Sequence, residues 1–102
     1  MSTITSIKIR LSQQGGSMGK VTLRIAAYAA RNEISNADIS RRTKDLLESH
    51  FGGNWLAFVG TDFAAVFSSG EECVEGTMAH YAISRENEDQ DLGIMMFQTK
   101  AQ

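Results

Sequence analysis

The sequence predicts an α+β fold in which two antiparallel helices pack on one face of an antiparallel β-sheet. Three observations support this fold class. Apolar residues alternate with polar ones near the N-terminus, then recur every three to four residues along two stretches, and finally form short apolar runs between turns. Alternation is typical of half-buried strands, and the longer period is typical of amphipathic helices. We therefore predict the order β-α-α-β-β-β-β, in one domain that covers residues 1–102.

The first half of the chain predicts one strand and a helical hairpin. Residues 4–11 alternate and form the strand, and the following turn ends in Ser17, which can cap the next helix. That helix runs over residues 18–32. A second helix follows the capping-box-like pair Ser35 and Asp38 and ends at the Gly-Gly-Asn sequence of residues 52–54. Within it, Asp38 and Arg42 have the spacing of an ion pair.

The second half of the chain predicts four strands. Residues 55–59 and 63–68 are uncharged apolar runs, residues 73–84 alternate loosely, and residues 92–97 follow an acidic loop at 85–91. A strand with one face in water normally alternates, and an edge strand normally carries a Lys, a Pro or a bulge. The two uncharged runs neither alternate nor carry a Lys or a Pro. We therefore expect a second chain to cover them and one strand edge to bind a partner.

Composition excludes several classes of protein. The chain has 10 basic and 12 acidic residues and a net charge of −2, whereas a nucleic-acid-binding domain is expected to be strongly basic. No apolar run approaches the roughly 20 residues that span a bilayer. The N-terminus has no signal-peptide core, and the single Cys73 cannot form an internal disulfide. We expect no membrane partner, no nucleic acid and a reducing compartment.

No motif in the chain predicts catalysis, a metal or a cofactor. The turn at residues 14–22 resembles a phosphate-binding loop, but Gln14 replaces its first Gly and Val21 its Ser or Thr. The acidic stretch at residues 89–93 lacks the length and the terminal Glu of a calcium loop. Cys73, His50 and His80 do not have zinc-ligand spacing. We therefore predict that the protein is not an enzyme and has neither a cofactor nor a metal site.

Residues 38–67 resemble the central segment of the small homodimeric dynein light chains. In that family a helix ends in an aromatic residue, a Trp-containing strand leads to Val-Gly, and the next strand opens with Phe. The matching positions here are Asp38, Ile39, Phe51, Trp55, Val59, Gly60 and Phe63. The order of the elements agrees with that family over nearly the whole chain.

The resemblance implies a dimer in which the strand at residues 63–68 crosses to the partner's sheet. Its other edge takes up an extended peptide as an added strand, in the manner of β-augmentation. The implied peptide-binding residues are Asn36, Ala37, Phe63, Ala64, Ala65, Val66, Phe67, Ser68, Ser69 and Tyr81. Asn36 and Ala37 lie where the family reads the Gln of a Thr-Gln-Thr motif, and Tyr81 is the expected groove floor. The implied dimer interface contains Leu56, Phe58, Phe63, Val66 and Phe67.

The function implied by the resemblance is that of a non-catalytic dynein light chain that binds the intermediate chain. It pairs with itself or with another light chain, in a cytoplasmic, cytoskeletal motor or in the axoneme of a cilium. Leu56 replaces the family's interface His, and Ala64, Ala65 and Val66 replace its Gly, Ser and Tyr, which indicates a divergent paralog. Two alternatives stay open at this point: a general dimeric peptide-binding hub, and a small nucleotide binder that uses the Gly-rich turn.

Overall fold

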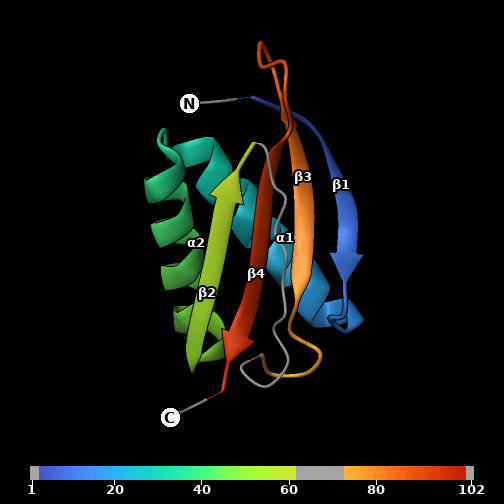
Figure 1. The fold of residues 1–102 in the computed structure, drawn as a ribbon, viewed down its shortest axis with the longest axis vertical. Coiled ribbons are helices and arrows are strands. Elements are labelled where there is room, and N and C mark those ends of the chain that lie inside the picture. The colour runs from blue at the N-terminus through green and yellow to red at the C-terminus, as the bar shows by residue number, and fades with distance from the viewer. Residues whose placement is uncertain (1–2, 62–72, 101–102) are drawn as a thin grey trace.

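The computed structural model describes residues 3–61 and 73–100 and shows two layers, a sheet and a pair of helices. Its elements in chain order are β1 (Ile4–Ser12), α1 (Gly16–Asn32), α2 (Asn36–Phe51), β2 (Asn54–Gly60), β3 (Ala79–Arg85) and β4 (Leu92–Thr99). Both helices lie on the same side of the sheet, α2 beside β2 and α1 across the other strands (Figure 1). The predicted α+β class and the helical hairpin are confirmed. The strand predicted at residues 63–68 lies outside the described residues.

The sheet has the strand order β1-β3-β4-β2, and each neighbouring pair is antiparallel. Strands distant in the sequence therefore lie side by side: Ile7 pairs with Ile83, and Leu56 with Phe97. β3 and β4 form the centre, and the loop that joins them extends beyond the rest of the sheet (Figure 1). Within the described residues, β1 and β2 are the two edges.

Helix α1 can lie close to the sheet because it buries small side chains: Thr22, Ala26, Ala27, Ala29 and Ala30. The predicted cap at Ser17 is wrong. The helix begins at Gly16, its N-cap is Gly15, and no side chain accepts a capping hydrogen bond. Ser17 is already inside the first turn, because the extended conformation that a cap requires falls two residues earlier, at φ −66° and ψ 165°.

Helix α2 begins and ends as the sequence predicts. The Ser35 hydroxyl accepts a hydrogen bond from the Asp38 backbone N–H at 3.1 Å, and Gly52, at φ 74°, donates its N–H to the Glu48 carbonyl at 2.9 Å. The predicted Asp38–Arg42 ion pair is wrong. Asp38 pairs with Arg41 at 3.1 Å, and the Arg42 guanidinium instead reaches Glu33, before the helix, at 3.0 Å.

The core lies between the two layers. One contiguous cluster joins residues of α1 and α2 to the sheet residues Trp55, Ala79, Tyr81, Ile83, Leu92, Ile94 and Met96. Trp55 has no exposed surface, and its indole N–H donates to the Gly52 carbonyl at 3.1 Å, so this side chain anchors the core. Among the helices in residues 3–61 and 73–100, none has the length and apolar character that crossing a membrane requires.

Candidate peptide and dimerisation surface

The side chains of β2 separate onto the two faces of the sheet. Trp55 points to the helices, so the neighbouring Leu56 and the next alternate residue, Phe58, point to the face that carries no helix. Leu56 pairs with Phe97 of β4, and Phe58 pairs with Met95. The rings of Phe58 and Phe97 stack with their centroids 6.2 Å apart. Leu56 is 39% exposed and Phe58 is 40% exposed. Two large apolar side chains of an edge strand are thus accessible from outside.

This apolar patch contains the two described residues of the predicted dimer interface. Leu56 and Phe58 flank Met95 and Phe97, both of which are buried although they face away from the helices. The other predicted interface residues, Phe63, Val66 and Phe67, lie outside the described residues, as do the predicted peptide-binding residues Ala64, Ala65, Ser68 and Ser69. The patch is the kind of surface that marks a protein interface.

Helix α2 supplies hydrogen bonds to the outer edge of β2. Glu48 accepts a hydrogen bond from the Trp55 backbone N–H at 2.9 Å, and the Ser40 hydroxyl donates to the Ala57 carbonyl at 2.7 Å. Alternate residues of an edge strand direct their backbone groups away from the sheet, where a side chain or water satisfies them when no strand does. Hydrogen bonds from Lys44 and from the Trp55 N–H hold the pKa of Glu48 below its usual value.

The start of α2 is the second predicted recognition element. Asn36 and Ala37 are exposed in its first turn, directly after the Ser35 cap. The first backbone N–H groups of a helix have no partner within the helix and are available to an acceptor. Ser40, one turn further along, bonds to β2, so the helix start and the strand edge belong to one surface.

Tyr81, predicted as the floor of a peptide groove, lies in the core. It is 1% exposed, faces the helices, and shares a hydrogen bond of 2.7 Å with the Thr22 hydroxyl of α1. Thr22 also donates to the Gln14 amide oxygen. Burial raises the pKa of Tyr81, and the Thr22 hydrogen bond opposes that rise. This polar network ties α1 to β3, and we leave Tyr81 out of the peptide site.

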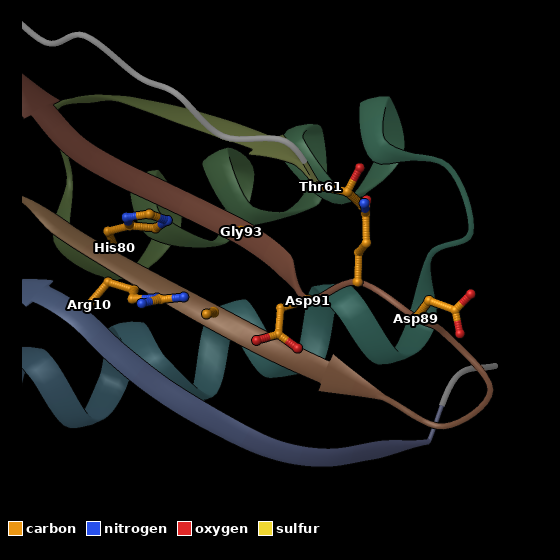
Figure 2. A pocket seen from close by; sticks show the side chains of 8 residues that line it. Arg10, Thr61, His80, Asp89, Asp91 and Gly93 are labelled. Atoms are coloured by element: carbon orange, nitrogen blue, oxygen red, sulfur yellow. The ribbon is translucent and has the colours of Figure 1, made fainter.

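The sequence did not predict a polar pocket on the helix-free face of the sheet. It has a volume of about 590 Å³ and is lined by Arg10, Thr61, His80, Ala82, Asp89, Gln90, Asp91 and Gly93. Arg10 of β1, His80 of β3 and Asp91 before β4 lie along this face (Figure 2). Burial, and then the charge of Arg10, lowers the pKa of His80. Four segments of the chain build the pocket: Arg10 of β1, Thr61 after β2, two residues of β3, and residues 89–93. No local sequence motif predicts it.

The pocket is lined by charged and polar side chains. Asp91 is held by the Ser84 hydroxyl, which donates to it at 2.7 Å, and the charges lining the pocket are of both signs. Within residues 3–61 and 73–100, no group of three His, Cys, Asp or Glu side chains is placed to hold a metal ion. The Gly-rich stretch at residues 14–22 forms the end of the turn between β1 and α1 and the first part of α1.

Comparisons with known proteins give the fold a name. No protein-family model matches the sequence, and no curated protein matches it. A solved structure does match: the dynein light chain-like domain of the Fasciola hepatica calcium binding protein FhCaBP2, determined as a mercury derivative. The match has a TM-score of 0.71 and 12% sequence identity, and it covers 97% of this chain and 98% of that chain. The chain therefore has the dynein light chain-like fold.

Proposed function

We propose that this protein is a non-catalytic light-chain subunit of a dynein motor complex, which dimerises and binds extended peptides by strand addition. The observation that supports the proposal most is the full-length likeness to a dynein light chain-like domain, found independently of the sequence resemblance. The uncharged edge of β2, with Leu56 and Phe58 exposed, supports the dimer. The partner is a second copy or another light chain, and the clients are segments of the intermediate chain or of other proteins.

The proposed peptide site combines two elements. One is the outer edge of residues 63–69, which receives the peptide as an added strand and contributes main-chain hydrogen bonds. The other is the start of α2 at Asn36 and Ala37, whose exposed N–H groups receive the polar side chain of the peptide motif. A dimer presents two such sites and holds two client chains together at high effective concentration. The protein then acts in the cytoplasm, on the cytoskeleton or in an axoneme.

The name of the structural neighbour includes calcium binding, and we do not extend that property to this chain. Two acidic residues of the loop after β3 have local partners: Glu88 contacts Arg85 at 3.6 Å, and Asp91 accepts a hydrogen bond from Ser84. No metal-binding cluster is present in the described part of the chain.

The test is a titration of the purified protein with a fluorescent Thr-Gln-Thr peptide, with its mass in solution measured alongside. We expect a dimer that binds one peptide per subunit. Phe63→Ala combined with Ala65→Lys places a charge on the peptide edge and should abolish binding, whereas Ser49→Lys on the exposed side of α2 should not. A dimer that binds no such peptide indicates a subunit dedicated to one assembly. A protein that stays monomeric at high concentration contradicts the proposal.

A further inference from the structure

We propose that the outer face of α1 is a docking surface for an acidic polypeptide segment of a partner protein. The surface consists of the exposed residues Lys20, Arg24, Tyr28 and Arg31, which we call the α1 basic stripe. Their spacing of three to four residues places them on one side of the helix. Helix α1 contains no acidic residue, so its whole exposed side has one sign of charge.

The charges of the stripe have no ionic partner among the residues that the structure describes. In the described part of the chain, Lys20, Arg24 and Arg31 take part in no ion pair. The basic residues of α2 differ, because each has an acidic partner: Arg41 with Asp38, Arg42 with Glu33, and Lys44 with Glu48. Within residues 3–61 and 73–100, the two helices thus carry equal numbers of Lys and Arg residues, and those of α2 have acidic partners whereas those of α1 have none.

The stripe lies on a rigid base. The opposite side of α1 is buried against the sheet through Thr22 and four alanines, and the Thr22–Tyr81 hydrogen bond fixes the helix to β3. A preorganised surface loses little entropy on binding. Tyr28 lies between Arg24 and Arg31 and is 48% exposed. Tyr and Arg are the residue types that contribute most to protein interfaces, and their adjacency here supports a protein partner.

The spacing of the stripe fits an extended acidic segment. Helical rise places Arg24 about 6 Å from Lys20 along the axis, and Arg31 about 10 Å further. An extended chain advances about 3.3 Å per residue, so carboxylates two and then three residues apart match the three cations. Three cations are few for a nucleic acid, where about 6–10 phosphate contacts are typical. A membrane-surface helix needs a broad apolar face, which the stripe lacks.

The test uses amide chemical-shift mapping of the full chain, labelled with ¹⁵N, on addition of an unlabelled Gly-Ser peptide that carries Glu at its first, third and sixth positions. The same peptide with Gln at these positions is the ligand control. We expect shifts centred on the amides of α1 that weaken as salt is added, because exposed charges are screened within about 10 Å at 0.1 M salt. Shifts centred elsewhere, or equal shifts with the Gln peptide, would overturn the proposal.

A pair of matched variants completes the test. The variant Lys20→Gln, Arg24→Gln and Arg31→Gln should weaken peptide binding by about tenfold or more, since three exposed charge pairs with the peptide are lost. Its control, with the same loss of charge away from α1, is Lys8→Gln, Arg41→Gln and Lys100→Gln, which should keep the affinity. Equal weakening of peptide binding in both variants would mean that the peptide is attracted non-specifically, and it would contradict the proposed docking surface.

Two further measurements distinguish an acidic peptide from other anionic ligands and the α1 basic stripe from the proposed peptide site. A duplex oligonucleotide or an anionic vesicle that binds the stripe more tightly than the acidic peptide would overturn the assignment of the partner. Binding of the Thr-Gln-Thr peptide should be unchanged in the α1 variant, because the proposed peptide site does not include α1. The docking surface and the proposed function can therefore fail independently.

Discussion

The two edges of the sheet are built in opposite ways. Along β1, Lys8 and Arg10 alternate with exposed Ile9 and Leu11, and the pairing with β3 is irregular at two places. Along β2, no residue is charged, and the pairing with β4 runs without a shift from Asn54 to Gly60. Charges and bulges are the means by which proteins prevent an edge from pairing with another chain. The comparison indicates that β1 is a protected edge and β2 a pairing edge.

Two side chains of helix α2 form hydrogen bonds with the backbone of β2 at this edge. The side chains of Glu48 and Ser40 satisfy one N–H and one carbonyl of β2, those of Trp55 and Ala57. Hydrogen bonds from side chains satisfy an edge without adding a strand to it. These two bonds satisfy the β2 edge in a single chain, and we expect a strand from a partner to replace them.

The largest expected effect is on oligomeric state. Leu56→Lys combined with Phe58→Lys places two charges on the exposed face of β2 and should convert the proposed dimer to a monomer. The same change on the protected edge, Ile9→Lys with Leu11→Lys, should leave the mass unchanged. Light scattering across a range of concentrations measures both. If the β1 variant dissociates and the β2 variant does not, the roles of the two edges are reversed.

An intermediate effect is expected from Glu48→Ala. It leaves the Trp55 N–H without its acceptor and should lower the free energy of unfolding by about 1 kcal/mol. Because the pKa of Glu48 is lowered in the fold, its contribution is present above about pH 4.5 and is lost as the pH falls through the folded pKa. Urea unfolding at neutral and at acidic pH measures both properties.

The control for Glu48 is Asp45→Ala, an exposed carboxylate in the same helix. It should change stability little and should leave the acid dependence in place. A loss of stability at Asp45 as large as that at Glu48 would mean that helix charge, and not the bond to the β2 edge, is the cause.

The smallest effect is expected from His80, on the pocket side of β3 facing Arg10 and Asp91. Its pKa in the fold is lowered by burial and then by Arg10, so the unfolded chain binds the proton more readily. Stability should therefore decrease as the pH falls below about 6.5, the usual His value. His80→Gln should remove that decrease, and Arg10→Gln should reduce it. An unchanged pH profile in His80→Gln would contradict this origin.

Features encoded locally were predicted well. The Ser35 cap and the glycines after α2 act through neighbouring backbone groups, so a few residues determine them. Two local predictions were wrong. Ser17 was chosen as a cap on residue type alone, while the backbone turned earlier. Arg42 was paired by spacing alone, whereas the α1–α2 turn brings Glu33 within reach of its guanidinium.

Site residues were harder to predict where they depended on a face of the sheet. The alternation that places Leu56 and Phe58 opposite Trp55 follows from the strand itself, so their exposure could be anticipated. The burial of Tyr81 could not be anticipated. Which side of β3 faces the helices depends on how the two layers pack, and there Tyr81 meets the Thr22 hydroxyl. The pocket of Arg10, His80 and Asp91 was missed because each comes from a different part of the chain.

For the described residues, the sequence by itself determined the two helices, the approximate places of the strands and which strand lacks protective charges, because side-chain periodicity and turn chemistry act over a few residues. The predicted strand at residues 73–84 was too long at its start, because β3 begins only at Ala79. Only the tertiary structure decided the strand order, the capping of the β2 edge by α2, and the separation of paired from unpaired cations on the two helices. Those features depend on contacts between residues far apart in the chain. Their geometry is set by how the helices pack on the sheet.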